Sequence, residues 1–285
     1  MSNRRFVLTL SCEDRPGIVA AVTTELADLG ANIAESDQFW DRVTNQFFLR
    51  ISILSPDSVS LESVQKSLDP VISRFDMKAR LVDMDNRPKV IVMVSKFDHA
   101  LLHILYQLRV GWMDAEVVAI VSNHETSRRT ADIEGIPYYH WPVTKETKGE
   151  QEDRLLKLVH ETGADLVVLA RYMQVLSDNL SKRLFGKVIN IHHSFLPSFK
   201  GAKPYHQAHA RGVKMIGATA HYVTPDLDEG PIIEQDAERV SHSLSAEDFV
   251  ARGRDIESRV LARAVKYHLE NRVMIVGNKT IVFTQ

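Results

Sequence analysis

The chain has 285 residues, which is enough for about two domains of ordinary size. Its 35 Lys and Arg residues nearly balance its 37 Asp and Glu residues, so the formal charge of −2 excludes a surface that is basic throughout and suited to nucleic acid or anionic membranes. With 44% hydrophobic and 25% charged residues, the composition excludes the disordered and fibrous classes.

The single cysteine, Cys12, excludes an intrachain disulfide and any metal site built on paired cysteines. The apolar stretch that follows Arg5 is too short for the hydrophobic part of a signal peptide. No segment approaches the roughly 18 uninterrupted apolar residues that a membrane span needs. We therefore expect a cytoplasmic protein that crosses no membrane.

Residues 1–84 predict a small domain of four strands and two helices. Apolar and polar residues alternate in the expected strands, and apolar residues recur at helical spacing between them. Pro16 suits the first turn of the first helix because it lacks an N–H, and Gly30 stands where that helix would end. In chain order we expect a strand over 6–11, a helix up to Leu29, strands over 35–40 and 46–54, a helix capped by Ser60 and a strand over 77–84. This βαββαβ order is the ferredoxin-like unit.

The stretch DRPGIVAAVTTELADLGANI, residues 14–33, resembles the start of an ACT domain, a small regulatory module that binds amino acids and pairs through its sheets or helices. The resemblance implies a ligand near the turn after the first strand, with candidate contacts at Asp14, Arg15, Pro16, Gly17 and Asn32. Backbone N–H groups at a helix start can hold a carboxylate. The resemblance also implies a homo-oligomer, with glycine and methionine as candidate effectors. The alternative is a well-capped turn in a module that only dimerises.

A polar linker over 85–88, which ends in Pro88, precedes a second domain over 89–285. Its strands are continuous apolar runs, typical of strands buried on both faces, and helical segments alternate with them. We expect strands over 90–94, 117–121, 137–141, 166–170, 188–191 and up to 221–224, helices over 100–108, up to 134, over 149–161, 177–184 and 246–270, and a hairpin over 273–282. This alternation predicts an α/β domain with a doubly wound, mostly parallel sheet.

Polar residues gather where two of these strands end. In such sheets, ligands bind beyond the carboxyl ends of the strands. Asn190 and His192 are two residues apart, so they point to the same face of a strand, and Asp228 follows another strand in a turn before Gly230. An amide, an imidazole and a carboxylate can polarise a carbonyl, stabilise an oxyanion and move a proton. These three residues are the predicted catalytic group.

The strings INIHHSFLP, GATAHYV and LDEGPII, which begin at positions 189, 217 and 227, resemble the folate-dependent formyltransferase family. By this resemblance Asn190 donates to the formyl oxygen. His192 stabilises the oxyanion or acts as a general acid, and Asp228 positions a water, tunes His192 and accepts a proton. The resemblance places the pterin ring against the loops over 171–176 and 224–228, with Pro225 where relatives often carry a carboxylate. The implied substrate-binding residues are Arg171, Tyr172, Met173, Val175, Leu176, His221 and Thr224.

An ACT module ahead of such a domain resembles the deformylase branch of that family. Its members hydrolyse 10-formyltetrahydrofolate to formate and tetrahydrofolate, which supplies formate to purine biosynthesis and balances one-carbon pools. Folate is the substrate, so the resemblance implies no cofactor.

The acceptor is inferred from the segment after the first strand of this domain. Relatives that formylate a glycinamide ribonucleotide carry a glycine-rich turn there, whose N–H groups hold the acceptor phosphate. Residues 94–100 read VSKFDHA, contain no glycine, and include Asp98, which would repel a phosphate. Water is then the expected acceptor. The alternatives are a formyltransferase with an amine acceptor and a non-catalytic amino-acid sensor.

Two further features leave alternatives open. His206 and His209, among 12 histidines, are spaced to share a helical face, but they complete no recognised zinc spacing and we expect no metal. The segment KGAKPY, residues 200–205, is either a loop that grips the anionic folate tail or an ordinary solvated loop.

Overall fold

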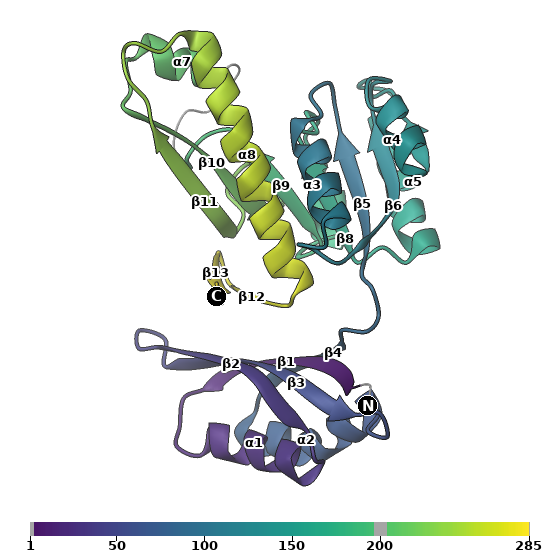
Figure 1. Ribbon diagram of the computed structural model, residues 1–285, viewed down its shortest axis with the longest axis vertical. Coiled ribbons are helices and arrows are strands. Elements are labelled where there is room, and N and C mark those ends of the chain that lie inside the picture. Colours follow the sequence, from purple (N-terminus) through teal and green to yellow (C-terminus); the bar gives the residue numbers. More distant parts are fainter. Residues whose placement is uncertain (1–2, 197–203, 285) are drawn as a thin grey trace. The chain divides into compact units, whose positions relative to one another are not determined.

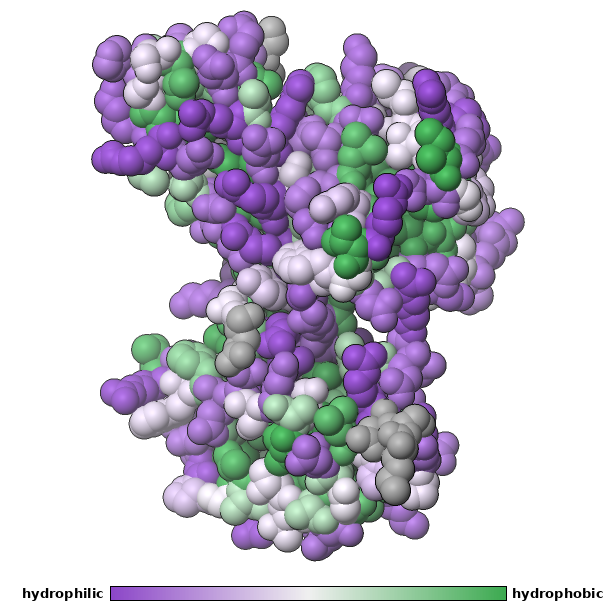
Figure 2. Space-filling model, viewed as in Figure 1, coloured by the Kyte–Doolittle hydropathy of each residue, from purple (hydrophilic) through white to green (hydrophobic). Residues whose placement is uncertain are grey.

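The computed structural model describes residues 3–196 and 204–284, which form two compact units. The first contains residues 3–87 together with 283–284, and the second contains residues 88–282. Figure 2 shows hydrophilic side chains over most of the visible surface, with apolar ones scattered among them. Within the described ranges, no helix combines the length and the apolar character that crossing a membrane requires.

The first unit is a four-stranded antiparallel sheet with two helices on one face (Figure 1). Its elements are β1 (Asn3–Glu13), α1 (Ile18–Asp28), β2 (Asn32–Asp41), β3 (Gln46–Pro56), α2 (Leu61–Phe75) and β4 (Lys78–Asp83), and the strand order is β2-β3-β1-β4. Alternate residues of β1 and β3, such as Leu8 and Ile51, are buried against Leu26 of α1 and Leu68 of α2. The alternation in the sequence therefore predicts the buried face, and the ferredoxin-like order is confirmed.

Two helix ends of this unit follow their sequence signals and one does not. Ser60 caps α2, since its Oγ accepts a hydrogen bond from the N–H of Ser63 at 3.1 Å. Gly30, at φ +69°, follows the end of α1. The prediction that Pro16 lies in the first turn of α1 is wrong. The helix begins at Ile18 because Gly17, at φ +94°, first takes the backbone through the left-handed region.

The second unit is a seven-stranded sheet of order β11-β10-β9-β8-β5-β6-β7, with helices on both faces (Figure 1). Its strands are β5 (Lys89–Val94), β6 (Glu116–Ser122), β7 (Tyr138–His140), β8 (Leu166–Ala170), β9 (Val188–His192), β10 (Met215–Tyr222) and β11 (Ile232–Arg239). Its helices are α3 (His99–Arg109), α4 (Arg128–Glu134), α5 (Lys148–Thr162), α6 (Asp178–Arg183), α7 (Pro204–Ala210) and α8 (Ala246–Leu269), and β12 (Val273–Val276) pairs with β13 (Lys279–Val282) in a hairpin.

The apolar run of β5 explains why both faces of this sheet are covered. Val90, Val92 and Val94 pack with residues of α3 and α8, whereas Ile91 and Met93 pack with residues of α5 and α6. The doubly wound arrangement is thereby confirmed, and it leaves the carboxyl ends of the parallel strands as the edge where a ligand can approach.

The sheet is parallel from β9 to β7 only. β10 runs antiparallel to both β9 and β11, so five of the seven strands are parallel and the expectation of a mostly parallel sheet is confirmed. An apolar run does not reveal strand direction, which is why this reversal has no signal in the sequence. The reversal sets His221 of β10 directly opposite Asn190 of β9.

Candidate active site

A cavity of about 260 Å³ opens at the carboxyl ends of β8 and β9. The residues that line it include the whole predicted catalytic group and all seven of the predicted substrate-binding residues: Asn190, His192 and Asp228, with Arg171, Tyr172, Met173, Val175, Leu176, His221 and Thr224. Pro225 also lines the cavity, so the second predicted pterin loop reaches it as well. Segments that are far apart in the sequence thus meet at one opening, as the strand-end rule predicts.

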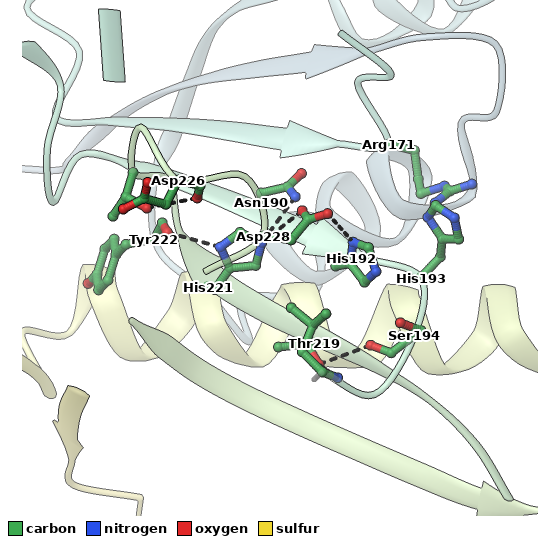
Figure 3. A network of polar contacts seen from close by, with 12 residues as sticks. Arg171, Asn190, His192, His193, Ser194, Thr219, His221, Tyr222, Asp226 and Asp228 are labelled. Carbon is green, nitrogen blue, oxygen red and sulfur yellow. Dashed lines mark hydrogen bonds and ion pairs between the residues drawn. The ribbon is translucent and has the colours of Figure 1, made fainter. Parts of the chain in front are cut away.

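The three predicted catalytic side chains form one polar network with His221 (Figure 3). Oδ2 of Asp228 lies 3.2 Å from Nδ1 of His192, and Oδ1 of Asp228 lies 3.7 Å from Nε2 of His221. Nδ2 of Asn190 lies 3.3 Å from the same Nε2 of His221. His221 therefore joins the amide on β9 to the carboxylate that follows β10.

The tautomer of His221 follows from its other contact. Its Nδ1 lies 2.9 Å from the carbonyl oxygen of Tyr222, and a carbonyl only accepts, so Nδ1 carries the proton. In the neutral ring Nε2 then accepts from Nδ2 of Asn190, whereas in the protonated ring Nε2 donates toward Oδ1 of Asp228. In the neutral ring this contact fixes one N–H of the Asn190 amide, and Asn190 also lines the cavity.

The turn after β10 places Asp228 by a tight approach of two backbone segments. Asp228 itself has φ +57°, in the left-handed region. A Cβ on Gly230 would stand 1.8 Å from the carbonyl oxygen of Tyr222, a separation that real atoms do not adopt. Only glycine fits there, so the Gly-Pro pair in the sequence signals a turn that closes against the end of β10.

Electrostatics keep Asp228 ionised. Burial, the largest influence, raises the pKa of its carboxyl, but the contacts with His192 and His221 outweigh burial and leave the pKa lowered. A carboxylate at this position fixes the proton of His192 on Nδ1. Nε2 of His192 is buried and has no hydrogen-bond partner within the described part of the chain. Of the two ring nitrogens of His192, Nε2 is therefore the one that Asp228 does not engage.

The loop over 171–176 is held by a residue that the sequence reasoning missed. The hydroxyl of Ser95, at the end of β5, accepts from the backbone N–H of Met173 at 2.9 Å and donates to Oδ1 of Asn123 at 2.7 Å. A serine directly after a buried strand was the available signal. Tyr172 is mostly buried in this loop, and burial raises its pKa to about 12, so its hydroxyl is neutral. The side chains of Met173 and Val175 are more than half exposed and offer an apolar surface.

The candidate regulatory residues of the first unit do not all come together. Asp14 follows β1, where its N–H donates to Asn45 at 2.9 Å, and Arg15 donates to the carbonyl of Arg74 at 3.2 Å. Asn32 pairs with Leu54, at the opposite end of the sheet. Within one chain Asn32 therefore lies away from the Asp14 turn, and its place in a ligand site stays a prediction. The reason is that α1 carries the backbone from one end of the sheet back to the other.

The structure bears on the segment 200–205 and on the histidines of α7, for which the sequence left alternatives open. Residues 200–203 of the candidate folate-tail loop lie outside the described residues. Tyr205 is buried and its hydroxyl donates to Oε1 of Glu257 at 2.8 Å, so it is not part of a solvated loop. His206 and His209 lie in α7, and Nε2 of His209 lies 3.1 Å from the carbonyl of Leu244. Within the described ranges, no group of three or more His, Cys, Asp or Glu side chains is arranged to hold a metal ion.

Comparison with known proteins places both units. The formyl transferase family model matches residues 88–265, and the ACT domain model matches residues 6–71. The fold and the network at the strand ends thus define an ACT-linked protein of the formyl transferase class. The chain is 48% identical to the formyltetrahydrofolate deformylase of Corynebacterium sp. (strain P-1), over 98% of each chain. It is 38% identical to the protein of that name from Escherichia coli (strain K12), over 99% of each. The chain belongs to the formyltetrahydrofolate deformylase family.

Solved structures give the same result. The crystal structure of the formyltetrahydrofolate deformylase from Burkholderia mallei matches with a TM-score of 0.93 and 49% identity, covering 98% of this chain and 99% of that one. A glycinamide ribonucleotide transformylase from Symbiobacterium toebii matches with a TM-score of 0.63 and 29% identity, covering 69% of this chain and 94% of that one. The deformylase therefore resembles this protein over both units.

Proposed function

We propose that the protein hydrolyses 10-formyltetrahydrofolate to formate and tetrahydrofolate. The observation that carries this proposal is the network of Asn190, His192, His221 and Asp228, which brings an amide, an imidazole and a carboxylate together in the lining of the cavity. Membership of the deformylase family supports the choice of substrate.

In the proposed mechanism, water attacks the formyl carbon while the free N–H of Asn190 stabilises the charge that develops on the formyl oxygen. Oδ1 of Asp228 accepts a hydrogen bond from that water. Nε2 of His192 takes one proton of the water and returns it to the folate nitrogen as the C–N bond breaks, which gives tetrahydrofolate and formic acid, and the acid loses its remaining proton to solvent as formate. The lowered pKa of Asp228 makes it a poor proton acceptor, so we assign proton transfer to His192 and revise the expectation for Asp228.

Water is the proposed acceptor because the segment after β5 is already engaged. The hydroxyl of Ser95 holds Asn123 and Met173, and Asp98 stands directly before the first turn of α3. A carboxylate at a helix start disfavours a phosphate there. Transfer to an amine on a phosphorylated acceptor is the second candidate, and nothing at this segment favours it.

We place the reaction in the cytoplasm, without a cofactor, where it supplies formate for purine biosynthesis and balances one-carbon pools. We further propose that the first unit pairs with a second copy and binds an amino acid, with glycine and methionine as the candidates. The match of residues 6–71 to the ACT domain supports this proposal. A bound effector should change the affinity for folate by about 5–150-fold. Folate titrations of the full chain with and without each amino acid measure that factor, and equal affinities would remove both candidates.

The test of the activity is formate release from 10-formyltetrahydrofolate by the purified chain, with water as the only acceptor and a chelator present. Release that disappears in His192→Ala supports the proposal. Absence of release by a folded parent protein contradicts it, and the same folate offered with candidate amines then tests the formyltransferase alternative.

A further inference from the structure

A second charged cluster lies beside the network and has no role in the mechanism above. Its centre is Glu257 of α8, whose side chain is 1% exposed. Nε2 of His99 lies 2.8 Å from Oε2 of Glu257, the hydroxyl of Tyr205 donates to Oε1 at 2.8 Å, and Nε of Arg171 lies 3.2 Å from Oε2. A buried carboxylate is costly unless it is paired, and three separate elements supply partners for this one. Such a cluster needs an explanation.

Arg171 connects this carboxylate to the active site. Its backbone has φ +65°, a conformation that side chains other than glycine rarely adopt, at the start of the loop that lines the cavity. Figure 3 shows its side chain directed at the ring of His193, where Nη1 contacts Nδ1. A guanidinium only donates, so Nδ1 of His193 is the acceptor and the proton of the neutral ring is on Nε2. The contact with Arg171 thus fixes one tautomer of His193.

His193 in turn lies against His192. The two rings are stacked, with centroids 5.1 Å apart and planes 16° from parallel. The charged and titratable groups that act on His193 are Arg171, His192, Glu257 and Asp228, and the ring of Tyr205 packs at 6.5 Å.

Burial first, then Arg171 and His192, lower the pKa of His193 to about 4, although Glu257 and Asp228 act in the opposite direction. A second cation next to His192 would oppose its protonation, and this arrangement avoids one.

We propose that Arg171 and Glu257 are positioning residues: Glu257 fixes the guanidinium of Arg171, which holds His193 as a neutral imidazole stacked on His192, so that His192 alone takes up the proton during hydrolysis. The consequence for turnover rests on the proposed function. The state of His193 itself does not, and can be measured without substrate.

The direct test is the protonation of His193 in the full chain, labelled with ¹⁵N at histidine. The resonances of His193 are assigned by their loss in His193→Asn. At neutral pH we expect a protonated Nε2 and an unprotonated Nδ1. A doubly protonated ring, or a proton on Nδ1, overturns the proposal. If this state is found while the protein releases no formate, the deformylase proposal fails and the positioning proposal stands.

The test by turnover uses Arg171→Gln. The glutamine amide can still donate but carries no positive charge, so the pKa of His193 should rise, while burial continues to lower it. The loss of kcat/KM on the acidic side of the pH profile should then begin at a higher pH than in the parent. The second substitution His193→Asn should remove that feature, whereas a merely structural role of Arg171 would lower activity equally at every pH. Arg154→Gln, which removes an exposed arginine of α5 paired with Glu150, is the control and should keep the parent profile.

Glu257→Gln tests whether Glu257 acts on His193 through Arg171, since the amide keeps the size of the side chain and loses its charge. Arg171 is then released, and the variant should show the same pH feature as Arg171→Gln. The double variant should be no worse than Arg171→Gln alone, because both changes interrupt one chain of contacts. Losses that add, or a parent-like profile in folded Arg171→Gln, contradict the proposal.

Discussion

The turns after β1 and after β10 both contain aspartate, proline and glycine, but their polar groups bond to different kinds of partner. In the first unit, Asp14 and Arg15 both bond to backbone carbonyls of their own unit, at Asn45 and Arg74. In the second, Asp228 bonds to side chains that themselves face a cavity. These hydrogen bonds of the first turn stay within its own unit, whereas the side chain of Asp228 bonds to residues that line a cavity. The comparison indicates that the second unit is organised for chemistry before any ligand arrives.

The largest effect should come from the groups that face the opening. Either Asn190→Ala or His192→Ala should lower the turnover for formate release by at least about 10²–10³, the usual cost of losing one oxyanion-stabilising donor. Rates are measured at saturating folate, and circular dichroism checks that each variant is folded. Near-parental turnover in a folded variant would remove that residue from the mechanism.

A smaller effect should follow from disturbing the turn that places Asp228. In Gly230→Ala the new methyl group collides with the carbonyl of Tyr222, so the backbone must shift. We expect a loss of about 1–3 kcal/mol in the free energy of unfolding, as for other overpacked sites, together with reduced formate release.

Gly149→Ala is the matched control for Gly230→Ala, because no atom lies within 4 Å of the added carbon and the glycine is in α5. There we expect unchanged turnover and stability that is equal or higher. Equal behaviour of the two alanine variants would contradict the tight turn.

The charge of Asp228 should appear as a pH-dependent contribution to stability. Its pKa is lowered in the folded state, so the carboxylate stabilises the fold above its ordinary pKa, and this contribution is lost as the pH falls toward the folded value. In urea unfolding, Asp228→Asn should be less stable than the parent at pH 7. The gap should narrow below about pH 4, near the ordinary pKa of aspartate. A gap that stays constant with pH would mean that shape, rather than charge, sets the contribution of Asp228.

The grouping of Asn190, His192 and Asp228 at the cavity could be predicted from the sequence because its parts follow from local geometry. A spacing of two puts Asn190 and His192 on one face of a strand, and the Asp-Glu-Gly-Pro string marks a turn. The cluster around Glu257 could not be predicted in this way. Its partners come from α3, α7 and the loop after β8, and only the packing of α8 across the sheet brings them together.

Asn32 shows that closeness in the sequence can also mislead. Asn32 and the Asp14 turn are close in the sequence, but α1 separates them by the length of the sheet. The short separation along the chain did not predict a short distance in space, since one helix is enough to carry the backbone from one end of the strands to the other. The strand-end rule succeeded in the second unit because it concerns the direction of strands rather than distance along the chain.

The smallest effect on stability should come from removing one helix cap in each unit. Ser60 caps α2 in the first unit and Ser245 caps α8 in the second, each accepting a backbone N–H at 3.1 Å. Replacing either by alanine should cost about 1 kcal/mol. In Ser60→Ala, faster hydrogen exchange should appear in α2 amides and formate release should stay at the parent rate. In Ser245→Ala, the faster exchange should appear in α8, the helix that carries Glu257. Equal changes in both helices from either substitution would mean that the two units do not unfold separately. The contrast between the turn after β1, whose bonds stay within its unit, and the turn after β10, which lines a cavity, would then not extend to the stability of the two units.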